Sequence, residues 1–183
     1  MNRFATFVCA AAVFGAGPAL AQSNATKPGP HGVVHASVIG ADGRDHGVVT
    51  LKDTPHGVLV TTNLNGLPEG EHGFHFHEKG MCEPQQKFTT AGGHYAPGGS
   101  KHGFMVEQGP HGGDMPNQHV GASGKLVSEV LNTGVTLADG PRTLFDMDGS
   151  ALVIHAKPDD YKSQPSGDAG DRIACAVLAA PKK

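Results

Sequence analysis

The sequence predicts an all-β protein, a sandwich or flattened barrel, and three observations carry this prediction. Short runs rich in valine and threonine recur along the chain, as strands require. Clusters of Gly, Asp, Asn and Pro separate these runs and indicate turns. No window shows a long apolar stripe at helical spacing. Seven or eight short strands with Gly-rich turns are typical of such folds. The expected strands are residues 32–39, 47–53, 57–67, 71–78, 124–131, 150–157 and 172–179.

The start of the chain has the features of a secretory signal peptide over residues 1–21. A basic Arg3 precedes a short apolar run, and the sequence A-L-A ending at Ala21 fits a cleavage site. The alternative, a transmembrane anchor, is disfavoured because the apolar run is too short and no charged stop follows. We expect export, no membrane contact after cleavage, a flexible segment over 22–30, and one domain over 31–180.

Charge and cysteine content narrow the class of protein further. The formal net charge of −3 is mildly acidic and argues against a nucleic-acid partner. Once Cys9 is removed with the signal peptide, only Cys82 and Cys175 remain. In an oxidising compartment two cysteines indicate one disulfide, although two free thiols are the alternative.

The first predicted functional element is the strand within "GFHFHEKGMC", residues 73–82. Successive side chains of a strand point to opposite faces, so Phe74 and Phe76 share one face, and His75 and His77 share the other. The phenylalanines suit a core. The two histidines, about 7 Å apart between Cα atoms, can converge on one ion.

Two long stretches that do not fit as strands are expected to be functional loops, residues 83–123 and 157–171. Unstructured loops of this length are unusual in a compact domain unless they are functional or disordered. The first loop is rich in glycine and resembles a linker, but it carries four regularly placed candidate ligands. These are His94, His102, His111 and Asp114, a nitrogen and oxygen set of the kind that tetrahedral zinc prefers.

A later histidine, His155, lies in the predicted strand "ALVIHAKP". Leu152 and Ile154 would face the core, so His155 would face outward, as His75 and His77 do. Any one of the 12 histidines of the chain is more often a surface or packed residue than a ligand, so the prediction depends on their spacing.

Taken together, these motifs resemble those of the copper/zinc superoxide dismutases, in their exported bacterial form. The resemblance rests on five motifs in the family's order, "GFHFHEKGMC", "AGGHYAPGGSKHG", "GPHGGDMPN", "ALVIHAKPDD" and "GDAGDRIACAVL". It implies a Greek-key barrel of eight strands with two long functional loops. It also implies one copper ion and one zinc ion per subunit.

The resemblance implies a role for each candidate residue. The copper ligands would be His75, His77, His94 and His155, and the zinc ligands His94, His102, His111 and Asp114. His94 would bridge the two metals.

Two further roles follow from the resemblance alone, and the predicted disulfide agrees with it. Asp159 would accept hydrogen bonds from one copper ligand and one zinc ligand, while a solvated loop carboxylate is the alternative. Arg172 would attract and orient the anionic substrate, while a strand-end arginine facing solvent is the alternative. Cys82 and Cys175 match the family's disulfide.

The expected function is conversion of superoxide to dioxygen and hydrogen peroxide by Cu(II)/Cu(I) cycling, with Arg172 and His94 as the catalytic residues. Zinc would be structural and would tune His94. The resemblance places the protein in a bacterial periplasm and leaves its assembly open, with a homodimer among the alternatives. The competing hypothesis is a non-catalytic copper- and zinc-binding module, a chaperone or store, on the same fold.

Overall fold

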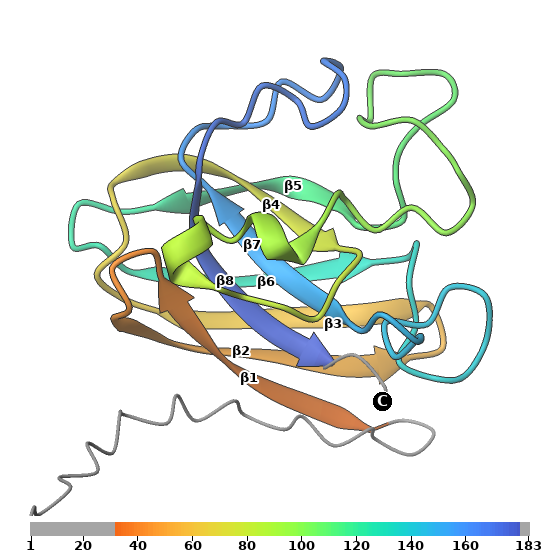
Figure 1. The fold of residues 1–183 in the computed structure, drawn as a ribbon, viewed down its shortest axis with the longest axis horizontal. Helices are drawn as coiled ribbons and strands as arrows, with labels where there is room; N and C mark the ends of the chain where they lie inside the picture. Colours follow the sequence, from red (N-terminus) through yellow and green to blue (C-terminus); the bar gives the residue numbers. More distant parts are fainter. Residues whose placement is uncertain (1–31, 180–183) are drawn as a thin grey trace, which may run out of the picture.

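The computed structural model describes residues 32–179, which form an eight-stranded antiparallel barrel with almost no helix (Figure 1). The predicted signal peptide (1–21) and N-terminal segment (22–30), and the ends of the predicted domain at 31 and 180, lie outside the described residues. The strands are β1 (Val33–Gly40), β2 (Asp45–Thr54), β3 (Gly57–Leu64), β4 (Gly70–His77), β5 (Asp114–Val120), β6 (Leu126–Asn132), β7 (Ser150–His155) and β8 (Arg172–Ala179). Two short 3-10 helices, η1 (Pro84–Gln86) and η2 (Thr89–Ala91), lie between β4 and β5.

The strand order along the sheet is β5-β4-β7-β8-β1-β2-β3-β6, and every neighbouring pair is antiparallel. The pairings of β3 with β6 and of β4 with β7 join strands far apart in sequence, as Greek-key connections do. The end strands β5 and β6 approach each other, so the barrel is nearly closed (Figure 1). The predicted all-β Greek-key barrel is therefore confirmed.

The predicted loop 83–123 is wrong near its C-terminal end, where a strand is present. Residues 114–120 form β5, which pairs with β4 from Gly70↔Val120 to His75↔Asp114. Polar residues and Pro116 obscure the strand pattern in "DMPNQHV". Pro116 is tolerated because β5 is an end strand, where a missing N–H breaks no ladder.

The barrel encloses the main apolar core, which includes Phe74 and Phe76 from β4 and Leu152 and Ile154 from β7, all fully buried. Burying one such side chain stabilises the fold by about 1.5–3 kcal/mol. These four residues alternate along their strands, so the core face of β4 and β7 is the one that the sequence predicts.

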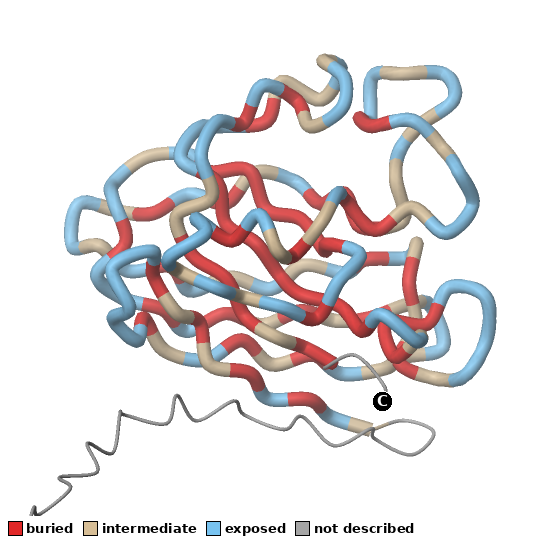
Figure 2. The backbone as a smooth tube through the Cα atoms, in the orientation of Figure 1, coloured by how far each residue is buried: buried red, intermediate tan, exposed pale blue. Residues whose placement is uncertain are grey.

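A second, smaller apolar cluster lies on the outer face of the barrel. Phe88 and Ala91 pack there on Ala151 and Val153 of β7 and on Cys175 of β8. The segment with η1 and η2 crosses in front of these strands (Figure 1). As a result β7 is buried on both faces, whereas β6 alternates between exposed residues and residues that are buried or half-buried (Figure 2).

Two long loops lie on the same outer side of the barrel, next to β4 and β5; they are residues 78–113 between β4 and β5 and residues 156–171 between β7 and β8 (Figure 1). They touch directly, since the backbone N–H of Met105 donates to the carbonyl of Tyr161 at 3.0 Å. Within residues 32–179, no helix is long and apolar enough to cross a membrane.

Candidate metal centres

Strand β4 presents its two histidines on the face opposite the core. His75 and His77 are fully buried even so, because the two long loops cover this face. His75 lies opposite Asp114 of β5, and His77 forms an isolated bridge with His94 of the first loop. The outer face of β4 thus forms one wall of the site, and the loop between β4 and β5 places His94 against this wall.

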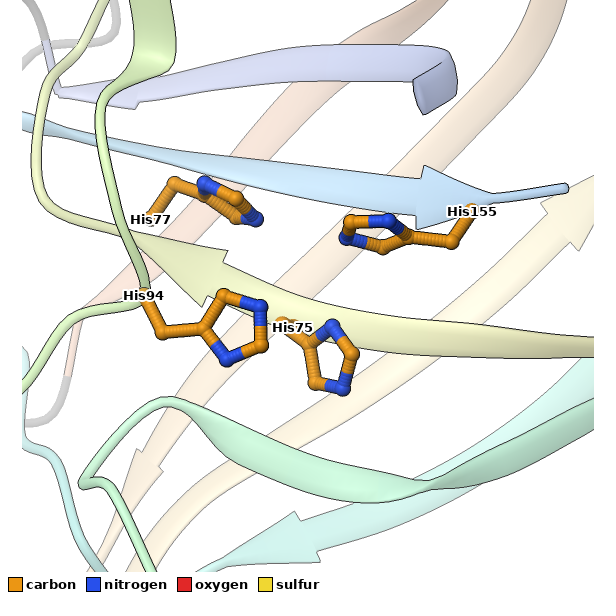
Figure 3. Close-up of side chains that lie close together, drawn as sticks. All are labelled: His75, His77, His94 and His155. Atoms are coloured by element: carbon orange, nitrogen blue, oxygen red, sulfur yellow. The ribbon is translucent and has the colours of Figure 1, made fainter. Parts of the chain in front are cut away.

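Four histidines converge at this wall, His75 and His77 from β4, His155 from the end of β7, and His94 from the loop (Figure 3). One nitrogen of each lies within 4.8 Å of the corresponding nitrogens of the others. The rings of His75 and His94 stack with their centroids 4.0 Å apart. We refer to these four histidines as the four-histidine group.

Each ring of this group uses one nitrogen to contact the protein. Nε2 of His75 donates to Asp159, and Nδ1 of His77 donates to the carbonyl of Gly92 at 3.0 Å. Nδ1 of His155 lies 3.4 Å from the carbonyl of Gly170, a longer contact. These contacts set the ring orientations and leave the other nitrogen of each ring pointing into the group.

The inward nitrogens are buried, and none has a hydrogen-bond partner among the described residues. They are Nδ1 of His75 and Nε2 of His77, His94 and His155. Buried polar atoms without partners are rare and costly in native proteins. Four convergent imidazole lone pairs fit a transition-metal ion such as copper or zinc.

Burial favours the neutral form of three of these histidines, His77, His94 and His155, and so leaves them able to bind a metal. Desolvation lowers the pKa of His77 and of His155 well below its usual value, and repulsion from neighbouring histidines and Arg172 adds to the effect. Desolvation likewise lowers the pKa of His94 to about 4. A neutral imidazole offers a lone pair, whereas an imidazolium does not.

A second group joins His94, His102, His111 and Asp114, again with ligand atoms within 4.8 Å of one another. Oδ1 of Asp114 lies at its centre, 3.0 Å from Nδ1 of His94, 3.1 Å from Nδ1 of His102 and 3.4 Å from Nδ1 of His111. Three nitrogens and one carboxylate oxygen form the donor set of a tetrahedral zinc site. We refer to these residues as the aspartate group.

Asp114 also shapes the loop around it. Its Oδ2 accepts the backbone N–H groups of Gly103 at 2.9 Å and of His111 at 3.0 Å. Burial alone would raise the pKa of Asp114, but hydrogen bonds with His102, His111 and His94 outweigh burial and hold this pKa far below its usual range. The carboxylate is therefore charged and able to bind a cation.

Asp159 links the two groups through one buried carboxylate. Its Oδ2 accepts from Nε2 of His75 at 2.8 Å, and its Oδ1 accepts from Nε2 of His102 at 3.0 Å. Burial would raise the pKa of Asp159, but hydrogen bonds with His102 and His75 keep this pKa below its usual range. Gly167 passes so close that a Cβ there would meet Oδ1 at 1.8 Å, and its φ of +68° also favours glycine.

His102 therefore contacts carboxylates on both sides. Burial would lower the pKa of His102, but the hydrogen bonds to Asp114 and Asp159 raise it to about 9. With Nε2 donating to Asp159, Nδ1 faces another acceptor, Asp114, and only a cation between the two makes that contact favourable. A proton can take this place, and so can zinc.

Arg172, at the start of β8, reaches the edge of the four-histidine group. Its Nη1 donates to the carbonyl of Phe88 at 2.7 Å, and its Nη2 donates to the carbonyl of Gly92 at 2.6 Å. The carbonyl of Gly92 also accepts from His77, so the guanidinium lies beside a candidate copper ligand. Within residues 32–179 the guanidinium makes no other hydrogen bond, so its remaining N–H groups can donate to a further acceptor.

The disulfide between Cys82 and Cys175 is present, as predicted, with a Cα–Cα distance of 5.7 Å. It ties the loop that contains Phe88 to the strand that begins at Arg172. Sequence reasoning missed two polar residues beside the site, Asn117 and Gln164, which contact backbone groups of Asp159 and His102. No local motif identifies such residues, because their partners are distant in sequence.

The other described histidines do not join either group. His72 is buried, with its ring nitrogens 2.7 Å from the carbonyl of His155 and 2.9 Å from that of Pro68. Within residues 32–179, no further group of three or more potential ligands shares a site. His31 lies outside the described residues. The remaining described histidines are His35, His46, His56 and His119.

Comparison with known proteins agrees with this geometry. Residues 45–178 match the family model described as copper/zinc superoxide dismutase. The chain is 48% identical over 146 residues to "Superoxide dismutase [Cu-Zn] 2" of Aquifex aeolicus, covering 79% of this chain and 85% of that protein. It is 43% identical over 146 residues to "Superoxide dismutase [Cu-Zn]" of Caulobacter vibrioides, covering 78% and 83%. A crystal structure of a SOD-like protein from Bacillus subtilis matches with a TM-score of 0.75 and 36% identity, covering 79% and 97%.

Proposed function

The chain belongs to the copper/zinc superoxide dismutase family, and from this membership we propose that it converts superoxide into dioxygen and hydrogen peroxide at a paired copper and zinc centre. The balanced reaction takes two superoxide ions and two protons to one dioxygen and one hydrogen peroxide. The observation that carries the proposal is the convergence of four buried, unpartnered histidine nitrogens on one point, next to a second group that shares His94.

We assign the four-histidine group to copper and the aspartate group to zinc, one ion of each per subunit. Copper supplies one-electron chemistry by alternating between Cu(II) and Cu(I), whereas zinc has no redox chemistry and supplies fixed charge. The all-nitrogen set suits copper, and the mixed set with a central carboxylate suits zinc.

His94 is the residue that joins the two groups. Its Nε2 points into the four-histidine group, and its Nδ1 faces Asp114 in the aspartate group. His94 would therefore be a ligand in both groups, with one ring nitrogen directed to each. In the proposed reaction Nε2 of His94 would hold one of the two protons that hydrogen peroxide requires, water would supply the other, and the ring would regain its proton before the next turnover. The aspartate group keeps the ring in place throughout.

Arg172 is the proposed binding group for superoxide. Two of its N–H groups are held by backbone carbonyls, which fixes the plane of the fork. The positive charge then lies in a permanent position beside His77, and it can attract and orient a small anion. Because the net charge of the chain is −3, such local positive charge has to offset the overall repulsion of an anionic substrate.

The experiment that tests the proposal is metal analysis combined with a superoxide-consumption assay on the purified protein. We expect about one copper and one zinc per chain, loss of turnover when copper is removed, and recovery when copper alone is returned. Bound metal without copper-dependent turnover would overturn the proposal in favour of the metal-binding module.

We also propose that the protein is exported and works in a bacterial periplasm. The disulfide supports this, because such bonds persist in oxidising compartments. The sequence of residues 1–21 supports it independently. Determining the N-terminus of protein purified from a periplasmic fraction tests both points, with Gln22 as the expected first residue.

A further inference from the structure

Gln164 makes a two-way hydrogen-bonded contact with the backbone of His102. The backbone N–H of His102 donates to Oε1 of Gln164 at 3.0 Å, and Nε2 of Gln164 donates to the carbonyl of His102 at 2.8 Å. The same Nε2 also donates to the carbonyl of Lys162 at 3.0 Å. The side-chain amide thus uses its acceptor and both of its donor hydrogens.

This contact joins the two long loops at a point that both metal groups depend on. Gln164 belongs to the loop between β7 and β8, and His102 belongs to the loop between β4 and β5. The fully buried ring of His102 lies between Asp114 and Asp159, and Asp159 in turn holds His75. A displacement of His102 would therefore shift Asp114 in the aspartate group and, through Asp159, His75 in the four-histidine group.

His102 donates to Asp159, and the backbone of Asp159 makes a similar two-way contact, with the side-chain amide of Asn117. The backbone N–H of Asp159 donates to Oδ1 of Asn117 at 2.8 Å, and Nδ2 of Asn117 donates to the carbonyl of Asp159 at 2.9 Å. The His102–Asp159 hydrogen bond is thus held between two residues whose backbones are each paired with a side-chain amide. Neither amide contacts a candidate metal-binding atom.

The loops also leave little freedom at this point. Gly103 has a φ of +103°, and a Cβ on it would lie 2.1 Å from the carbonyl oxygen of Tyr161. The backbones are in close contact one residue beyond His102, so a small shift of one loop must move the other. The contact of Gln164 with the backbone of His102 can therefore determine where the His102 ring lies between Asp114 and Asp159.

From this geometry we infer that Gln164 is a positioning residue for the zinc site, acting through the backbone of His102. The inference rests on the proposed function only in its assignment of the aspartate group to zinc. Partners that orient metal ligands from outside the coordination sphere typically contribute 10- to 100-fold to metal affinity. Gln164 contacts the backbone of His102 and not its ring, so we expect an effect at the lower end of this range. Loss of the Gln164 side chain should weaken zinc binding by about tenfold.

The test compares Gln164→Ala, Gln164→Glu and the control Gln108→Ala in the full mature protein. Gln108 is an exposed glutamine of the same loop as His102, and within residues 32–179 its side chain makes no hydrogen bond or ion pair. Zinc affinity is measured by competition with a chelator. The absorption spectrum of Co(II) bound in place of zinc reports the ligand geometry independently of turnover.

The glutamate variant separates geometry from charge. Glutamate keeps the acceptor for the N–H of His102, but it places a carboxylate oxygen against the carbonyls of His102 and Lys162. Its negative charge would by itself favour a nearby cation. If positioning dominates, Gln164→Glu binds zinc less tightly than the wild-type protein does, despite the added charge.

Support requires weaker zinc binding in both Gln164 variants and an altered Co(II) spectrum, with Gln108→Ala unchanged. The inference is overturned if zinc affinity in Gln164→Ala stays within about twofold of the control. It is also overturned by an unchanged Co(II) spectrum, or by wild-type affinity in Gln164→Glu. A wild-type protein that binds both metals but does not consume superoxide would refute the proposed function and leave this inference intact.

Discussion

His77 and Arg172 share one acceptor, the carbonyl oxygen of Gly92, which lies 3.0 Å from Nδ1 of His77 and 2.6 Å from Nη2 of Arg172. A candidate copper ligand and the candidate substrate-binding residue are thus placed by the same peptide group. Since Gly92 precedes His94 by two residues, one short segment of the first loop sets the relative position of three candidate active-site residues.

Replacing Arg172 tests the value of this shared acceptor. Arg172→Lys keeps the positive charge but cannot donate to the carbonyls of Phe88 and Gly92 from a fixed fork. We expect the rate constant for superoxide consumption to fall at least about tenfold, with metal content unchanged. The control is Arg142→Lys, since Arg142 is exposed and belongs to neither metal group, and its Nη1 donates to the backbone carbonyl of Thr133. Equal rates for the two variants would contradict the assigned role.

Asp159→Asn tests the connection between the two groups. An amide can accept from one histidine, but its NH2 group then faces the donor nitrogen of the other. We expect metal affinity to fall by about 10- to 100-fold, with zinc affected because His102 loses its orientation. Chelator competition measures the effect, and Asp168→Asn in the same loop is the exposed control. Unchanged affinity for both metals would show that Asp159 has no orienting role.

The disulfide is expected to stabilise the fold and to place Arg172. Its two cysteines are 93 positions apart, and a closed loop of that length corresponds to about 4.6 kcal/mol in the chain-entropy model. We expect the double variant Cys82→Ser/Cys175→Ser to lose roughly this much free energy of unfolding in denaturant titrations. Turnover should also fall, because Phe88 supplies the carbonyl that holds Nη1 of Arg172. A loss below about 1 kcal/mol with full activity would refute both expectations.

The metal-stripped protein should be most stable near pH 6.5. The folded-state pKa values of His77, His94 and His155 lie below 6.5, so the unfolded chain binds more protons and stability falls as the pH drops from about 6.5 toward 4. The pKa of His102 is raised to about 9. Protonated His102 therefore contributes fully to the free energy of unfolding below pH 6.5, and this contribution is lost as the pH rises to about 9.

Thermal unfolding of the stripped protein between pH 5 and 9 measures this dependence, with the metal-loaded protein as the reference. Bound metal replaces the titrating protons, so the loaded protein should show a flatter profile over the same range. A stripped protein whose melting temperature rises steadily from pH 5 to 9 would contradict the prediction.

The sequence could predict the barrel and the aspartate group because both leave local patterns, whereas the four-histidine group follows as a set only from the family resemblance. Alternation in "FHFH" separates the Phe74 face from the His75 face, and the spacing of His102, His111 and Asp114 within glycine-rich sequence indicates a wrapped ion. It could not reveal β5, where Pro116 and polar residues on an end strand obscure the alternation. Nor could it reveal Gln164, whose partner is a backbone group 62 residues away.

The outer apolar cluster around Phe88 makes the strands of this barrel differ in how much sequence change they can accept. On β6, where burial alternates, exposed positions such as Val127 and Leu131 can accept polar residues with little loss. On β7, where every residue is buried, neither face has such positions. Among relatives, substitutions to polar residues should therefore occur at every second position of β6 and should be rare along β7.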